Sequence, residues 1–192
     1  MKKEQLTIID NFADNLREVR SKVIAGELKD IIGPDGAKYT NVSDFQPEGW
    51  HERLAEAVGF DVDVVMSGFR YDFADEMPHN MVHADVICAK YAALVYCNRP
   101  HQCSGGTAFW EHIPTGRVSM PESGEIPADD YAEIEADWNL GDPWRQHSFV
   151  SMRSNRMAIY PTKMFHCRWP HAGFGNTRHN GRLVWVCFFN RK

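Results

Sequence analysis

Short strand-forming runs, separated by turn residues, fill the chain from residue 62 to residue 189. Apolar, β-branched and aromatic residues dominate these runs, and Gly, Pro, Asn or Asp interrupt them. The expected strands cover residues 62–72, 82–88, 92–97, 103–110, 149–152, 156–160 and 182–189. Many short strands in succession are typical of β-sandwiches and β-barrels. The pattern therefore predicts a mainly β fold built around an all-β core.

The first sixty residues follow a different pattern. We expect a short strand at 7–10, after which apolar residues recur at helical spacing within 11–32. A turn should follow at 31–36, and a second short helix at 50–59 should end at its glycine. The segment 1–60 is thus predicted to be a helical support packed outside the barrel.

A length of 192 residues suits one domain, 1–192, with a core of ordinary size. No apolar run approaches the ~20 residues of a membrane helix, and the N-terminus does not resemble a signal peptide. The five cysteines lack any Cys-x-x-Cys spacing, which favours reduced thiols and a cytoplasmic location. A homodimer is the default expectation for the oligomeric state.

The net charge of −5 conceals an uneven distribution. The segment 119–144 carries eight acidic residues and no Lys or Arg, whereas 145–192 carries nine Lys or Arg and no acidic residue. Acidic and basic faces could meet and neutralise each other, or the basic end could surround an anionic ligand. The acidic insertion, with an expected helix at 127–138, is either a substrate lid or a solvated loop.

Two histidines and one carboxylate are candidate ligands for non-haem Fe(II), a metal held by a facial triad of this composition. His83 and Asp85 are two residues apart, so on a strand their side chains would share one face. The second histidine must come from a remote strand, and His166 follows an apolar run. His171 is an alternative, but Pro170 directly before it indicates a loop.

An arginine that could anchor a carboxylate opens the last expected strand. Arg182 precedes a long apolar run, so its side chain can point into the barrel from a rigid element. A buried arginine without an anion would be unfavourable, which argues for an anionic ligand beside it. Arg178 competes for this role but lies in an expected loop.

The order of these motifs resembles the Fe(II)/2-oxoglutarate-dependent dioxygenases, in particular the branch of prolyl 4-hydroxylases and phytanoyl-CoA hydroxylases. The likeness spans roughly residues 65–190 and includes the opening segment 8–12. It rests on four segments: His83-Ala-Asp85, residues 93–98, residues 105–112 and residues 155–166. The resemblance implies a double-stranded β-helix, or jelly-roll, with iron at its open end.

The resemblance also implies the site and its cofactors. His83, Asp85 and His166 would bind Fe(II), and 2-oxoglutarate would chelate the metal and pair with Arg182. The reaction would consume O2 and release succinate and CO2, with hydroxylation or oxidative demethylation favoured by the presence of the carboxylate ligand. Three further residues are weaker candidates for contact with the cosubstrate: Tyr71, Tyr96 and Thr107.

Three hypotheses follow. The first is a 2-oxoglutarate-dependent hydroxylase acting on an amino acid, a peptide side chain or a small metabolite. The second is a cupin-like metal enzyme that uses no oxo acid, and the third is a β-barrel binding protein without catalysis. The acidic chain, which lacks a basic and aromatic stripe, argues against a nucleic-acid ligand.

Overall fold

The computed structural model describes residues 6–33, 36–76, 81–121 and 127–192. In this part of the chain no helix is long and apolar enough to cross a membrane. The helices are α1 (Leu16–Ala25), α2 (Trp50–Val58) and α3 (Ala128–Ala136), with 3-10 turns η1 (Pro100–Gln102) and η2 (Asp137–Asn139). The strands are β1 (Thr7–Ile9), β2 (Lys29–Ile32), β3 (Lys38–Ser43), β4 (Val62–Asp72), β5 (Tyr91–Tyr96), β6 (Gly106–His112), β7 (Trp144–Ser151), β8 (Met157–Pro161), β9 (His166–Trp169) and β10 (Arg182–Arg191).

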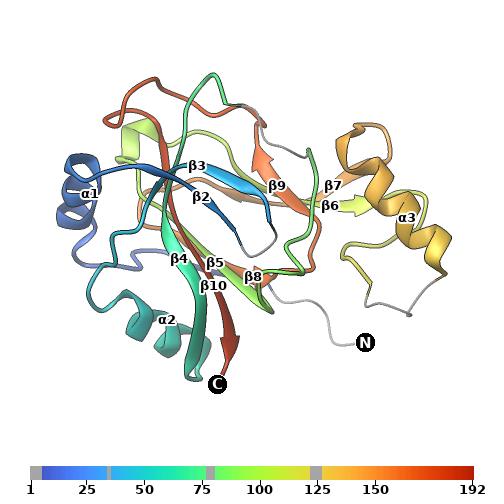
Figure 1. Ribbon diagram of the computed structural model, residues 1–192, viewed down its shortest axis with the longest axis horizontal. Coiled ribbons are helices and arrows are strands. Elements are labelled where there is room, and N and C mark those ends of the chain that lie inside the picture. Colours follow the sequence, from blue (N-terminus) through green and yellow to red (C-terminus); the bar gives the residue numbers. More distant parts are fainter. Residues whose placement is uncertain (1–5, 34–35, 77–80, 122–126) are drawn as a thin grey trace.

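The strands form two antiparallel sheets. The larger has the order β1-β8-β5-β10-β4-β3-β2, and the smaller has the order β7-β6-β9 (Figure 1). A buried cluster between the sheets joins side chains of β5, β6, β7, β8 and β10. Two sheets with a shared apolar core are the expected result of strands that alternate inward and outward residues. The mainly β prediction is confirmed.

Helices α1 and α2 pack against one face of the larger sheet. Val19 and Val23 of α1 and Trp50 and Leu54 of α2 are fully or almost fully buried, in one cluster with Trp185 and other side chains of β4, β5 and β10. Residues along a strand alternate between the two faces of a sheet. The face of the larger sheet opposite α1 and α2 therefore points into the space between the two sheets. That interior contains the candidate site.

The expected strand at 82–88 is wrong. His83 forms one isolated antiparallel bridge with His166, after which the chain leaves the sheet. The amide of Cys88 donates to the carbonyl of Asp85 at 3.0 Å and closes a turn, and Ile87 is 70% exposed. The apolar run therefore belongs to a loop, because strand propensity without a neighbouring strand to pair with does not make a strand.

Two other expectations need correction. The turn predicted at 31–36 is part of a hairpin, since β2 and β3 extend the larger sheet on either side of it; residues 34–35 lie outside the described residues. This hairpin was not predicted, because polar residues interrupt its short apolar runs and most of its residues are exposed or half-buried. The expected strand at 103–110 begins only at Gly106, where an added Cβ would lie 2.0 Å from the carbonyl oxygen of Val150.

The acidic insertion contains the expected helix, shortened to α3 and η2. Ile134 of α3 is fully buried in a cluster with Val82, Ala84 and Phe165. The amide of Val82 donates to the carbonyl of Trp138 at 2.9 Å. The insertion thus packs against the loop that carries His83 and Asp85, while residues 122–126 lie outside the described residues.

Candidate metal centre and arginine cluster

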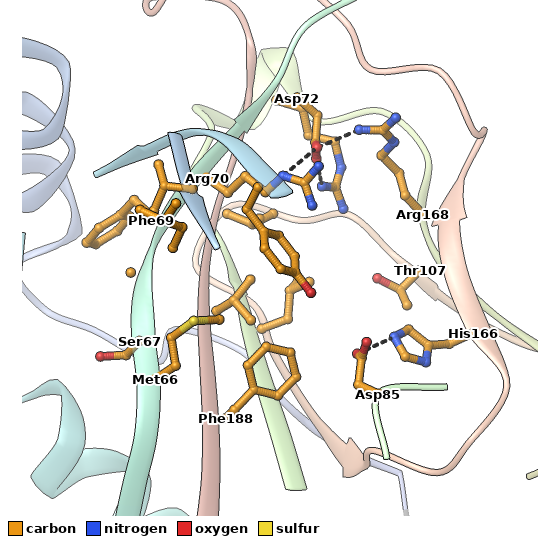
Figure 2. A pocket seen from close by; sticks show the side chains of 18 of the residues that line it. Met66, Ser67, Phe69, Arg70, Asp72, Asp85, Thr107, His166, Arg168 and Phe188 are labelled. Atoms are coloured by element: carbon orange, nitrogen blue, oxygen red, sulfur yellow. Dashed lines mark hydrogen bonds and ion pairs between the residues drawn. The ribbon is translucent and has the colours of Figure 1, made fainter. Parts of the chain in front are cut away.

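His83, Asp85 and His166 meet at one point, although the chain separates the first two from the third. One potential ligand atom from each lies within 4.8 Å of the other two. The Nε2 atom of His166 lies 3.2 Å from a carboxylate oxygen of Asp85 (Figure 2). The Nε2 atom of His83 lies 3.8 Å from the other carboxylate oxygen of Asp85. Two imidazoles and one carboxylate converging in this way can hold a divalent cation on one side and leave its other positions open.

Backbone hydrogen bonds fix the three residues. The amides and carbonyls of His83 and His166 exchange two hydrogen bonds, at 3.1 and 2.9 Å. The amide of Asp85 donates to the carbonyl of Thr162 at 2.8 Å. The loop is therefore held at both ligand positions, which explains why side chains outside a regular strand still converge.

The His166 ring is oriented by a further contact. Its Nδ1 lies 2.8 Å from the carbonyl oxygen of Met164, so Nδ1 carries the proton and donates it. In the neutral ring Nε2 then carries no proton and can bind a cation, an arrangement common among metal-binding histidines. Burial lowers the pKa of His166, but the hydrogen bond that the protonated ring donates to Asp85, together with the charge of Asp85, raises that pKa overall.

A cluster of three arginines around one buried carboxylate lines the same cavity. The carboxylate of Asp72 contacts Nη1 of Arg168 at 2.6 Å and Nε of Arg70 at 3.4 Å (Figure 2). It also contacts Nη1 of Arg182 at 2.5 Å. Burial alone would raise the pKa of Asp72, but the charges of Arg182, Arg70 and Arg168 lower it overall. Asp72 is thus ionised, and the cluster keeps a net positive charge of two.

The cavity that joins these groups has a volume of about 170 Å³. Both the candidate metal ligands and the four members of the arginine cluster line it, together with Thr107 and Tyr160. The remaining wall is mainly apolar and comes from β2, β3, β4, β5 and β10: Ile31, Tyr39, Val42, Met66, Ser67, Gly68, Phe69, Leu94, Val184, Val186 and Phe188. Among the described residues of the acidic insertion, none lines this cavity.

The other three predicted cosubstrate contacts, Tyr71, Tyr96 and Thr107, do not all lie at the cavity. Thr107 lines the cavity, and its hydroxyl is hydrogen-bonded to that of Tyr96 at 2.8 Å. The Tyr96 ring supports Arg182, whose guanidinium carbon lies 5.9 Å from the ring centroid. Tyr71 is fully buried in the cluster on the helix side of the larger sheet, stacked on Phe73. The structure therefore brings Thr107 to the cavity and Tyr96 behind it, but not Tyr71.

The geometry also separates the alternatives that the sequence left open. His171 is not part of the three-residue group, and its carbonyl accepts a hydrogen bond from Arg168. Arg178 donates from Nη1 to the carbonyls of Ile24 and Gly26 at the end of α1, at 3.3 and 2.6 Å. Arg178 thus stabilises the C-terminal end of a helix, as basic side chains commonly do.

Arg70, Asp72 and Arg168 were missed by the sequence analysis. Each lies two residues from another residue of the site: Arg70 from Asp72 on β4, and Arg168 from His166 on β9. The rule that places alternate residues of a strand on one face could have found both pairs. Asp72 also supplies the anion that a buried Arg182 was expected to require.

The residues present fit a metal and an anionic cosubstrate. The N, N and O donor set suits Fe(II). Two buried arginine nitrogens, Nε of Arg182 and Nε of Arg70, have no hydrogen-bond partner within the protein. An anionic ligand in the cavity could accept hydrogen bonds from these two donors.

No family model and no curated protein matches the sequence. Solved structures do match by fold. HygX from Streptomyces hygroscopicus with iron bound has a TM-score of 0.59 at 12% identity, over 98% of this chain and 83% of that chain. HygX with nickel and 2-oxoglutarate bound has a TM-score of 0.58 at 13% identity, with the same coverage.

A second relative by fold is the epimerase SnoN in complex with Fe3+, alpha ketoglutarate and nogalamycin RO. Its TM-score is 0.55 at 13% identity, over 99% of this chain and 80% of that chain. These neighbours bind iron or nickel and 2-oxoglutarate (alpha ketoglutarate), the metal and cosubstrate chemistry of the family that the sequence resembles. The chain therefore shares the jelly-roll fold of proteins that bind iron and 2-oxoglutarate.

Proposed function

We propose that this protein is an Fe(II)- and 2-oxoglutarate-dependent dioxygenase that hydroxylates a small molecule, an amino acid or a peptide side chain. The observation that carries the proposal is the convergence of His83, Asp85 and His166 in the cavity that also contains Arg182. A metal site alone would fit many enzymes. A metal site that shares its cavity with a buried arginine fits a cosubstrate that is both a chelator and a carboxylate.

The protein's own residues have separable roles in this proposal. His83, Asp85 and His166 would hold Fe(II), and Arg182 would bind the distal carboxylate of 2-oxoglutarate. Once bound, Fe(II) and 2-oxoglutarate would reduce O2, forming succinate and CO2 and inserting the second oxygen atom into a C–H bond of the substrate.

Substrate positioning falls to the rest of the cavity. Val186 and Phe188 form part of an apolar wall that excludes water and packs against the substrate. Tyr160 lines the same cavity, and burial raises its pKa well above the usual value, so it remains a neutral phenol. The site is thus arranged to bind and orient, while the metal and oxo acid supply the bond chemistry.

Anaerobic titration of metal-free protein with Fe(II) and 2-oxoglutarate tests the proposal. A visible charge-transfer band that needs both components is the expected result. Metal binding without such a band would favour a cupin-like enzyme that uses no oxo acid. Failure of well-folded protein to bind either component would contradict the proposal and favour a binding protein.

The outcome of the reaction needs its own measurement, because SnoN is described as an epimerase. Hydroxylation adds one oxygen atom to the substrate, whereas epimerisation leaves its mass unchanged. Mass spectrometry of the product formed under 18O2, once a substrate is found by succinate release, distinguishes the two. Product of unchanged mass and inverted stereochemistry would replace hydroxylation by epimerisation with the same cofactors.

A further inference from the structure

Arg70 differs from the other two arginines of the cluster. The side chain of Arg168 is 10% exposed and that of Arg182 is 5% exposed, and each contacts Asp72 at 2.6 Å or less. The Arg70 side chain is 34% exposed, and its Nε lies 3.4 Å from Asp72 in an ion pair without a hydrogen bond. Arg70 lines the cavity and therefore keeps hydrogen-bonding capacity for a ligand there.

The other contacts of Arg70 hold it without neutralising it. Its guanidinium carbon lies 5.3 Å from the centroid of the Tyr39 ring on β3, a cation–π arrangement that orients a positive charge. Arg70 and Tyr39 both line the cavity. The candidate metal ligands line the same cavity as Arg70.

The charges of the cavity leave room for one more anion. Three arginines and Asp72 give the cluster a net positive charge of two, and Fe(II) on Asp85 would add one more. The doubly charged 2-oxoglutarate of the proposed function would cancel two of these charges. One positive charge would then remain without a counter-ion, and Arg70, the most exposed of the three arginines, is the side chain most accessible to a further anion.

Apolar side chains surround the position next to Arg70. Met66 lies on the same strand at the alternation that faces the cavity, and Val42, Val186 and Phe188 complete this part of the wall. A ligand reaching Arg70 is thus expected to combine one charged group with an apolar body.

We propose that Arg70 binds an anionic group of the substrate, a carboxylate or a phosphate attached to an apolar body. The inference rests on the proposed function, because it assigns 2-oxoglutarate to Arg182 and leaves Arg70 for the substrate. In this proposal Arg70 makes the protein bind anionic substrates more tightly than neutral ones. The negative charge of Asp72, which contacts all three arginines, reduces the repulsion between Arg70 and the other two.

Matched probes test this assignment without knowledge of the natural substrate. The protein is loaded with Zn(II), which supports no turnover, and with saturating 2-oxoglutarate. Hexanoate, hexanamide and hexyl phosphate are then titrated and followed by chemical-shift changes in 15N spectra. We expect hexanoate or hexyl phosphate to bind at least about tenfold more tightly than hexanamide, and the tighter of the two identifies the anion.

Variants assign the preference to one side chain. Arg70→Gln should abolish the preference for the anionic probe while changing 2-oxoglutarate affinity less than about twofold, and Arg70→Lys should retain part of it. Arg145→Gln is the matched control, because it removes the same charge from an arginine on β7 whose side chain is 66% exposed. This control should leave the preference intact.

Three results would overturn the inference, and they differ from failure of the proposed function. Equal binding of hexanoate, hexyl phosphate and hexanamide would remove the anion subsite. Loss of 2-oxoglutarate binding in Arg70→Gln would make Arg70 the cosubstrate anchor instead. Loss of the preference in Arg145→Gln would attribute it to overall charge. Failure of the protein to take up Zn(II) and 2-oxoglutarate, seen at the loading step, would instead reject the proposed function.

Discussion

Replacing Asp72 by Asn removes the single negative charge among three arginines. The carboxylate is almost completely buried and contacts Arg182 and Arg168 at 2.5 and 2.6 Å. Removing one partner of a buried ion pair typically lowers the free energy of unfolding by about 3–5 kcal/mol, because the remaining charges stay buried without a counter-ion. For a chain of this size, that loss lowers Tm by roughly 6–20 °C.

The effect should depend on pH in a defined direction. The arginines hold the pKa of Asp72 below its usual value, so its stabilising contribution is present above about pH 4. That contribution is lost as the pH falls through the lowered pKa of the folded state. The stability difference between wild type and Asp72→Asn should therefore be full at neutral pH and shrink in acid.

Urea denaturation at several pH values, with and without 2-oxoglutarate in the presence of Zn(II), measures both effects. The matched control is Asp63→Asn, the same change at an exposed position of β4. 2-Oxoglutarate should stabilise Asp72→Asn more than wild type, because its carboxylate replaces the missing charge beside Arg182. If Asp72→Asn is no less stable than Asp63→Asn, or gains no more from 2-oxoglutarate than wild type does, the reasoning about the cluster is refuted.

Three other predictions concern the anchor, the ligand and the thiols. Arg182→Ala should raise the Kd for 2-oxoglutarate roughly 30-fold or more in calorimetric titration, since a buried charge-paired contact contributes about 2–5 kcal/mol. Arg178→Ala should leave this Kd unchanged, and the reverse pattern would assign the anchor to Arg178. His166→Ala should abolish stoichiometric Fe(II) binding in equilibrium dialysis while His171→Ala retains it, and equal loss in both would contradict the assignment. Of the five cysteines only Cys103 is not buried. A thiol reagent at pH 8 should therefore modify one thiol in the native protein and five after unfolding. Rapid modification of more than one thiol in the native protein would contradict this packing. Burial raises the pKa of three of the unreactive thiols to about 12: Cys97, Cys167 and Cys187.

Local sequence patterns located most of the elements because those elements depend on neighbouring residues. The expected runs at 62–72, 92–97 and 182–189 correspond to β4, β5 and β10 within a few residues. All three lie in the sheet interior, where β5 and β10 carry apolar residues on both faces and β4 begins with alternating apolar and polar residues. The β2–β3 hairpin escaped prediction because it lies at the sheet edge and lacks that pattern.

The expected strand at 82–88 failed for a different reason. Its composition suits a strand, but only His83 finds a partner in a neighbouring strand, and the chain turns at Asp85. The prediction that His83 and Asp85 lie close together agrees with the structure, but its reason was wrong, because the two residues lie in a loop and not on one strand. Backbone hydrogen bonds to Thr162 and His166, about eighty residues away, hold the two side chains together.

The sequence by itself predicted the mainly β fold class from short-range spacing, and it predicted the candidate metal ligands and Arg182 but not Arg70, Asp72 or Arg168. Only the tertiary structure decided which of several histidines and arginines meet. The contact between Asp72 and Arg182 spans 110 positions of the chain, and no local pattern encodes such a pairing. It arises because β4 and β10 are antiparallel neighbours in which Asp72 lies opposite Arg182. Sheet register therefore determines which charged side chains meet in the cavity, and register depends on how the whole core packs.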